Sequence, residues 1–114
     1  IKEMEPLFSF GGHTGIHCSL SNDYTQKEEQ IVNSIETVKK HLGTHAPVFA
    51  YPFGQPEDFC FNDMDILQDH NIPMACTTVE GLNSFHNCQW SLKRFAIRNW
   101  SGLEFNRKIK SWIR

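Results

Sequence analysis

The stretch that decides how this chain folds is residues 7–20, LFSFGGHTGIHCSL. It places His13 and His17 four positions apart, and on one helical turn such side chains share a face, about 5–6 Å apart at Cβ. That separation suits two ligands of a single metal ion. The neighbouring glycines let the backbone leave a strand and turn sharply, so the pair stands at a strand end, where open hydrolytic sites commonly lie. His13 and His17 are therefore a candidate half of a metal site, and a solvated or capping pair is the alternative.

Composition indicates one globular unit and argues against two classes of partner. The 114 residues are 39% hydrophobic and include nine Phe, enough for a core of ordinary density. Eleven basic and thirteen acidic residues give a formal charge of −2, and no Lys/Arg run is long enough to follow a phosphate backbone. No apolar run has the length of a membrane span. We expect neither nucleic acid as a partner nor a membrane span, and the compartment stays open between cytoplasm and cell envelope.

Short apolar runs alternate with amphipathic stretches along the chain, which predicts an α/β fold. Strands are expected at residues 7–10, 48–51, 74–77 and 92–97. The second strand stops at Pro52, because proline cannot continue a ladder and the glycine that follows opens a turn.

Three helices are expected between and after these strands. The first begins with a capping box at Thr25–Glu28 and ends at Gly43, and its apolar residues recur at helical spacing. The second is capped by Asn62 and ends before the third strand. The third is capped by Ser101 and carries an apolar face to the end of the chain. The order of elements is that of a parallel sheet with crossover helices.

The predicted sheet has few strands, so its edge strands are expected to lack pairing partners. A parallel sheet of three or four strands leaves its edges and ends exposed. The chain also opens with Ile1 rather than Met. We therefore expect that sequence precedes Ile1 and supplies missing N-terminal strands. An exposed sheet edge also favours self-association or pairing with a companion segment.

Four segments together resemble motifs of one enzyme family. Residues 12–21, GHTGIHCSLS, resemble a His-Ser/Thr-x-x-His motif, and residues 49–54, FAYPFG, resemble a Phe-Ala-Tyr-Pro-Tyr/Phe-Gly motif. Residues 77–83, TTVEGLN, and residues 92–95, LKRF, resemble two later motifs. On these residues the chain resembles the polysaccharide deacetylases, also called carbohydrate esterase family four, in the Phe-Ala-Tyr-Pro-Phe-Gly subgroup. Residues 1–114 then form a single domain that aligns with the later two-thirds of the family's domain.

The resemblance implies a partial, distorted (β/α) barrel that hydrolyses N-acetyl groups of an amino-sugar polymer. It implies that His13 and His17 hold a divalent metal, usually zinc. One zinc with open positions can activate a water and polarise the amide carbonyl. The Phe53 N–H would help to hold the oxyanion. Tyr51, Pro52 and Phe53 would line the substrate, with core packing as the alternative for the two aromatic side chains. Thr14 would brace the histidine loop through its hydroxyl.

The chain also departs from the family pattern. The family's Thr-Phe-Asp-Asp motif, which supplies the third metal ligand and the general base, does not occur in the sequence. A Leu-His motif carrying a general acid is also lacking, and His86 is the nearest substitute, with a solvated loop side chain as the alternative. Asp23, Glu57 and Asp58 could approach the metal, but we rank them below an aspartate outside the chain.

Three hypotheses follow. The first is a metal-dependent polysaccharide N-deacetylase that needs an N-terminal part for its aspartates. The second is a non-catalytic carbohydrate-binding or interaction module that keeps the fold. The third is a different zinc amidohydrolase, which predicts that the Pro52 loop does not line the metal pocket. The sequence does not name the polymer, because chitin, poly-N-acetylglucosamine, peptidoglycan and capsule chains present the same acetamide.

Overall fold

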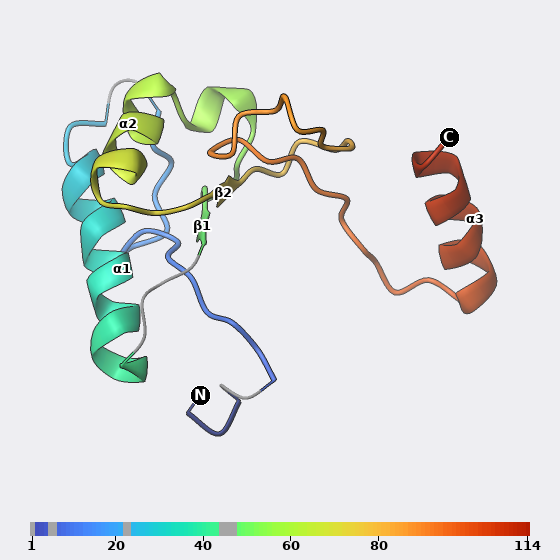
Figure 1. The fold of residues 1–114 in the computed structure, drawn as a ribbon, viewed down its shortest axis with the longest axis horizontal. Coiled ribbons are helices and arrows are strands. Elements are labelled where there is room, and N and C mark those ends of the chain that lie inside the picture. The colour runs from blue at the N-terminus through green and yellow to red at the C-terminus, as the bar shows by residue number, and fades with distance from the viewer. Residues whose placement is uncertain (1, 5–6, 22–23, 44–47) are drawn as a thin grey trace.

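The computed structural model describes residues 2–4, 7–21, 24–43 and 48–114, and Figure 1 shows their fold. The elements in chain order are η1 (Lys2–Met4), α1 (Lys27–Leu42), β1 (Phe49–Ala50), η2 (Pro56–Asp58), α2 (Phe61–Asp69), β2 (Ala75–Cys76) and α3 (Gly102–Trp112). These helices and strands confirm the predicted α/β class. Within the described residues the strands form a two-stranded sheet, and no closed barrel is present.

The sheet is parallel and is widened by one bridge on each side. β1 and β2 pair with Phe49 opposite Ala75. Gly12 forms a parallel bridge to β1, and Leu92 forms a parallel bridge to β2. Four chain segments therefore lie side by side in the order Gly12, β1, β2, Leu92. This order places the loop that carries His13 and His17 (the histidine loop) next to β1, and β1 leads into the loop at residues 51–54 (the Pro52 loop).

The strands predicted at residues 7–10 and 92–97 are wrong as strands. Neither range forms a ladder in the structure, and only the flanking bridges described above remain. Leu7 and Phe8 are 80% and 58% exposed, and Ile97 is 59% exposed. A strand is stabilised by pairs with neighbouring strands and by burial of one face. These apolar residues lack both among the residues that the structure describes.

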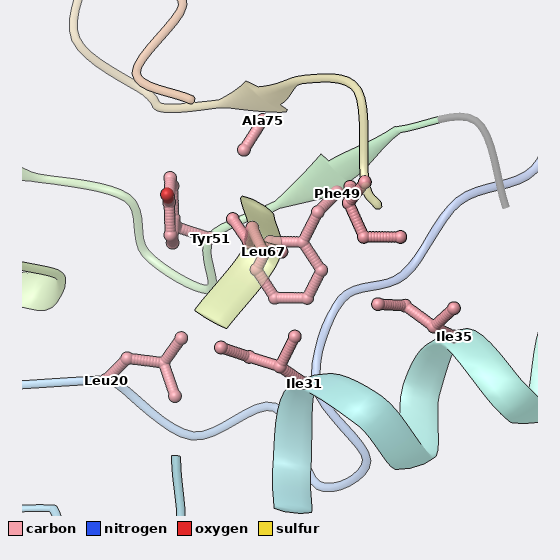
Figure 2. Close-up of a cluster of buried hydrophobic side chains, with 8 residues drawn as sticks. Leu20, Ile31, Ile35, Phe49, Tyr51, Leu67 and Ala75 are labelled. Carbon is pink, nitrogen blue, oxygen red and sulfur yellow. The ribbon is translucent and has the colours of Figure 1, made fainter. Parts of the chain in front are cut away.

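The core lies between the sheet and the helices α1 and α2 (Figure 2). It consists of eight buried side chains, Leu20, Ile31, Ile35, Phe49, Tyr51, Leu67, Ile72 and Ala75. α1 contributes Ile31 and Ile35, which are one turn apart and confirm part of the predicted apolar face. Burial of one such side chain contributes about 1.5–3 kcal/mol. This cluster is what holds β1, and with it the candidate site, against α1.

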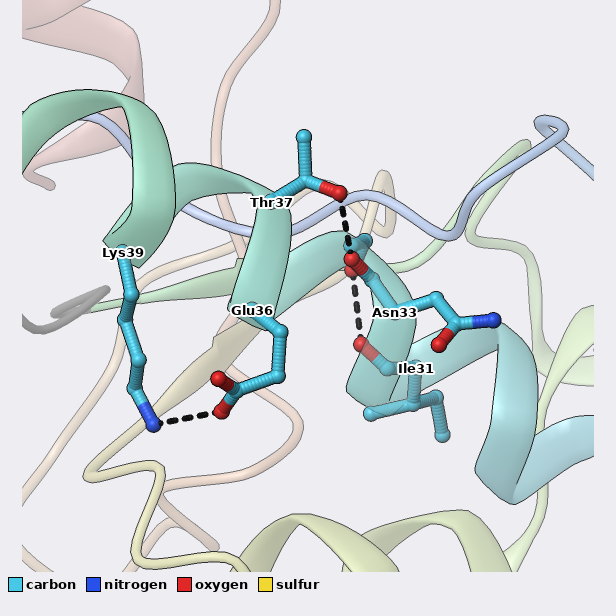
Figure 3. A network of polar contacts seen from close by, with 6 residues as sticks. Ile31, Asn33, Glu36, Thr37 and Lys39 are labelled. Carbon is cyan, nitrogen blue, oxygen red and sulfur yellow. Dashed lines mark hydrogen bonds and ion pairs between the residues drawn. The ribbon is translucent and has the colours of Figure 1, made fainter.

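α1 begins later than its sequence indicates and ends where its sequence indicates. Gln26 is its N-cap and makes no side-chain cap bond, so the capping box predicted at Thr25 is wrong. Gly43 ends the helix in the left-handed conformation, with φ of 67°, as predicted. Figure 3 shows the polar side of α1, where Lys39 Nζ lies 2.8 Å from Glu36 Oε1. Two hydroxyls there donate to carbonyl groups one turn back.

A buried ion pair joins the N-terminal ends of α1 and α2. Lys27 Nζ lies 3.3 Å from Asp63 Oδ1, and these side chains are 9% and 0% exposed. Asp63 Oδ2 also accepts the Cys60 N–H over 2.7 Å. Cys60 is the N-cap of α2, so the predicted cap at Asn62 is wrong. Because Asp63 is the third residue of α2 and its carboxylate accepts the N–H of the N-cap, the helix cap lies at Cys60, two residues before the predicted cap.

α3 lies apart from the other helices at the end of an extended segment (Figure 1). Ser101 caps it as predicted, because Ser101 Oγ accepts the Glu104 N–H and Glu104 Oε2 accepts the Ser101 N–H, at 3.3 and 2.9 Å. None of its residues is buried, and Leu103 and Ile113 are 61% and 66% exposed. Within the described residues the apolar face of α3 is therefore largely uncovered, apart from Trp112, on which the Phe95 ring stacks. In the described part of the chain no helix has the length and apolar character that a bilayer crossing requires.

Candidate metal-binding and substrate site

His13 and His17 stand next to each other, but on a loop and not on a helical turn as predicted. Thr14 and His17 have positive φ angles of 59° and 56°. This conformation turns the segment back on itself, so the two imidazole centroids lie 4.8 Å apart with their planes at 72°. Positive φ is uncommon for residues other than glycine and clusters at functional sites. The i, i+4 spacing thus predicts the proximity of the rings but not its cause.

Close packing of glycines seats this loop against β1 and α1. A Cβ on Gly11 would lie 2.1 Å from the Val48 carbonyl oxygen, which the backbone could not accommodate. Gly15 N–H donates to Gln30 Oε1 over 3.1 Å. Gln30 belongs to α1 and is buried, and its role was not predicted from the sequence. The signal that could have found it is an amide side chain one position before the apolar face residue Ile31.

A backbone carbonyl fixes the orientation of the His13 ring. His13 Nδ1–H donates to the Ala50 carbonyl oxygen over 2.7 Å, because a carbonyl oxygen can only accept. In the neutral imidazole the lone pair is then on Nε2. Metal-binding histidines usually give their other N–H to a carbonyl or carboxylate in this way. The arrangement fits His13 Nε2 as a metal ligand beside the His17 ring.

Phe53 is the residue of the Pro52 loop that meets the histidines. Its ring centroid lies 5.0 Å from that of His17, with the planes at 78°. Phe53 has a positive φ of 59° and is 58% exposed. Among the described residues no acceptor pairs with the Phe53 N–H. The Pro52 loop therefore borders the histidine pair, contrary to what the third hypothesis, a different zinc amidohydrolase, predicts.

Thr78 and Gly54 hold this loop in place. Thr78 Oγ1 donates to the Phe53 carbonyl oxygen over 2.5 Å, and Thr78 N–H donates to the Gly54 carbonyl oxygen over 3.0 Å. Gly54 has φ of 70°, and a Cβ there would lie 2.9 Å from Thr78 N. Thr78 belongs to one of the four motif segments, but no role was predicted for it from the sequence. Its role is to fix the backbone on which the Phe53 N–H and ring depend.

Tyr51 and Pro52 are fully buried, so the core-packing alternative holds for Tyr51. Tyr51 stacks on Phe59 with ring centroids 4.3 Å apart, and its hydroxyl donates to the Trp90 carbonyl oxygen over 2.8 Å. Burial, and secondarily the Asp63 carboxylate, raises the pKa of Tyr51 well above its usual range. In this chain Phe53 is the only one of the three predicted substrate-lining residues that solvent reaches.

Thr14 does not brace the loop in the way predicted. Its Oγ1 is buried and has no hydrogen-bond partner among the described residues. A buried hydroxyl without a partner costs free energy, on the order of 1–3 kcal/mol. The bracing that was predicted for Thr14 comes instead from Gln30 on the Gly15 N–H.

Two of the predicted additional acids and bases have local partners in the structure, and a third lies outside the described residues. Asp58 accepts from Ser19 Oγ at 2.8 Å and from the Gln55 N–H at 3.0 Å, so it is a structural group. His86 is exposed in a turn, where its N–H donates to Ser84 Oγ at 3.4 Å. Asp23 lies outside the described residues. In the described ranges no group of three His, Cys, Asp or Glu side chains could hold a metal ion.

The two later motifs are joined to each other by hydrogen bonds. Asn83 Nδ2 donates to the Lys93 carbonyl oxygen, and Lys93 N–H donates back to Asn83 Oδ1, at 2.7 and 3.0 Å. Arg94 Nε donates to the Thr77 carbonyl oxygen at 2.6 Å. These motif residues therefore fix the loop after β2, and through Thr78 they support the Phe53 loop.

Two solved structures are similar to this fold. The deacetylase PplD of Streptococcus pyogenes, in complex with acetate, matches with a TM-score of 0.81 and 28% identity over 93% of this chain and 47% of that one. IcaB from Ammonifex degensii matches with a TM-score of 0.75 and 20% identity over 97% of this chain and 50% of that one. No protein-family model and no curated protein matches the sequence.

These similarities define the fold as that of deacetylase structures. The chain spans about half the length of the two proteins that it matches. The predicted likeness to polysaccharide deacetylases is thus supported at the level of the fold, while the subgroup stays a prediction. The class that fold and site define is a deacetylase-like α/β structure with a histidine pair beside an exposed phenylalanine loop.

Proposed function

We propose that this chain carries the histidine half of the site of a metal-dependent polysaccharide N-deacetylase. The observation that supports it most is the cluster of His13, His17 and Phe53, with the Nδ1–H of His13 bonded to the Ala50 carbonyl oxygen, in a deacetylase-like fold. The third ligand and the general base would come from residues outside the described part of the chain. The substrate is an N-acetylated amino-sugar polymer.

The residues present would divide the chemistry as follows. His13 Nε2 and the His17 ring would hold a divalent metal, for which we propose zinc, and which when bound supplies an activated water and an electrophile for the amide carbonyl. The Phe53 N–H would donate to the carbonyl oxygen as negative charge develops on it. The exposed Phe53 ring would pack against the sugar. Hydrolysis of an acetamide gives a free amine and acetate, and acetate is the molecule present in the PplD complex.

A second function is favoured by one observation. The described residues contain two histidines at the site and no third side chain that could join them on a metal. A non-catalytic module that binds N-acetylated saccharide through the Phe53 loop would not need a third metal ligand. The two functions differ in whether the histidine pair binds metal at all.

Elemental analysis separates them. We expect zinc to co-purify with the wild-type chain or to be taken up on dialysis, and to be lost in His13→Ala, His17→Ala. The control is His41→Ala, His86→Ala, which removes the same number of imidazoles from exposed positions away from the cluster. Zinc uptake is then followed by an assay of acetate release from N-acetylglucosamine oligomers. Equal, low zinc in all three proteins would leave the saccharide-binding module as the function.

A further inference from the structure

The charge of this chain is divided unevenly along its length. Residues 93–114, which we call the C-terminal arm, hold seven of the eleven basic residues and one of the thirteen acidic residues. The arm therefore carries a formal charge of +6, while residues 1–92 carry −8. The overall charge of −2 conceals this division, which bears on what the arm can bind.

The arm also presents a continuous set of aromatic rings. Phe95 stacks on Trp112 with centroids 4.2 Å apart and planes at 10°. Trp112 in turn contacts Trp100, with centroids 5.9 Å apart. Lys108 Nζ lies 5.7 Å from the centroid of the Trp100 ring. Flat apolar faces flanked by cations are thus arranged from the extended segment to α3.

Two open cavities, each of about 330 Å³, lie along this set of rings. The first is lined by Thr78, Arg94, Phe95, Ala96 and Ile97. The second is lined by Trp100, Glu104, Arg107, Lys108 and Ser111. Each combines an aromatic ring with a basic side chain, and each is at the lower end of the volume range of small-ligand sites.

The first cavity and the support of the Phe53 loop share one residue. Thr78 lines it, and the same Thr78 hydroxyl donates to the Phe53 carbonyl oxygen. The stacked rings of Phe95 and Trp112 then connect this cavity to Trp100 in the second. A series of residue contacts therefore links the Phe53 loop, the two cavities and α3.

The acidic group in the second cavity is already engaged. Glu104 Oε2 accepts hydrogen bonds from the Ser101 N–H at 2.9 Å and from Ser101 Oγ at 2.8 Å. Arg107 and Lys108 are exposed and form no ion pair in the described structure. The cations of this cavity are therefore available to an anionic ligand, and the carboxylate is occupied in capping α3.

We propose that the C-terminal arm and Thr78 form a binding track for an acidic polysaccharide, which leads its N-acetylated residues to the Phe53 loop. This rests on the proposed function and narrows its substrate class to polymers that carry carboxylate or phosphate groups beside N-acetylated sugars. Sugar rings pack on the faces of Trp100 and Phe95. Arg94, Arg107 and Lys108 bind the anionic groups, because guanidinium and ammonium groups donate charge-assisted hydrogen bonds to them.

The test measures binding, by tryptophan fluorescence and calorimetry, with the complete 114-residue chain. One probe is an oligosaccharide of hyaluronan, in which N-acetylglucosamine alternates with glucuronate, and the other is a neutral N-acetylglucosamine oligomer of equal length. We expect the hyaluronan probe to bind more tightly, by about tenfold, and the difference to shrink in high salt. Arg107→Gln, Lys108→Gln and, separately, Trp100→Ala should each weaken it about five- to tenfold.

Matched controls separate the track from general charge and from the metal site. Lys39→Gln, Lys40→Gln removes two cations from α1 and should leave hyaluronan binding unchanged. Zinc uptake by the wild-type chain tests the proposed function separately: no zinc uptake with intact preference for hyaluronan would overturn the proposed function alone, and zinc uptake without that preference would overturn the track alone. Far-UV circular dichroism verifies that each variant is folded.

Three results would overturn the track. The first is equal affinity for the acidic and the neutral oligosaccharide. The second is a loss of binding in the α1 control as large as in the arm variants. The third is binding of single-stranded oligo-dT or of phosphatidylglycerol vesicles with no binding of either saccharide, which would assign the arm to nucleic acid or to a membrane surface.

Discussion

Residues 7–92, which we call the body, and the C-terminal arm are stabilised in different ways. The body buries an eight-residue hydrophobic core and a Lys27–Asp63 ion pair, and both lie against the sheet that carries the site. In the arm, no residue of α3 is buried. The arm is stabilised by the N-terminal cap of α3 and by stacked aromatic rings. The geometry of the histidine pair therefore depends on the body and on its contacts with Lys93 and Arg94, while α3 can change without disturbing it.

The largest effect is expected at the buried ion pair of the body. Lys27→Met removes the cation and leaves the Asp63 carboxylate buried without it, which should lower the free energy of unfolding by about 3–5 kcal/mol. Chemical denaturation followed by circular dichroism measures this. The control is Lys39→Met, which breaks the exposed pair with Glu36 and should cost at most about 0.5 kcal/mol. Equal effects of the two substitutions would contradict the role given to the buried pair.

A smaller and local effect is expected in the arm. Ser101→Ala removes the N-cap acceptor of α3 and should destabilise that helix by about 1 kcal/mol, while the body unfolds at an unchanged denaturant concentration. Amide hydrogen exchange resolves the two regions. Ser111→Ala is the control, because that hydroxyl donates to the Lys108 carbonyl oxygen at the other end of the helix. A loss of protection in the body as large as in α3 would show that body and arm unfold as one unit.

The smallest effect is expected from acid. Hydrogen bonds from the Ser101 N–H and then from its hydroxyl hold the pKa of Glu104 below its ordinary value of 4.5. Because the pKa of Glu104 is lower in the folded helix, the ionised cap stabilises α3 fully at pH values above the ordinary pKa of this carboxyl. That stabilisation is lost as the pH falls through the lowered pKa of the folded state. Nuclear magnetic resonance of α3 between pH ~6 and ~2 measures this loss. Glu104→Gln should remove the pH dependence, and an unchanged acid transition in that variant would contradict the assignment.

Sequence periodicity predicted the helices α1 and α3, because their formation depends mainly on residues close together in the sequence. α1 and α3 match their predicted ranges closely, because helical spacing and caps are encoded within a few residues. Strands at residues 7–10 and 92–97 were predicted wrongly, because a strand forms only where another segment pairs with it. The caps of α1 and α2 were also misplaced, since a long-range ion pair between Lys27 and Asp63 lies at both helix starts.

The sequence predicted which candidate residues lie close together, but it did not predict their local geometry. The sequence singled out His13, His17 and Phe53, which the fold brings together. It gave no indication that the histidines lie on a loop with positive φ angles, because such angles depend on the packing of that loop against other segments. For the same reason it missed Gln30, which reaches the loop from α1.

The central claim is that His13 and His17 form the metal-binding half of the site, with His13 binding through Nε2. Long-range proton–nitrogen correlation spectra of the histidine side chains during a zinc titration test it most directly. We expect the resonance of His13 Nε2 to shift on metal binding while Nδ1 stays protonated, and the resonance of a ring nitrogen of His17 to shift in parallel. Unchanged His13 and His17 spectra at saturating zinc, or loss of the Nδ1 proton of His13 with Nε2 unaffected, would contradict it.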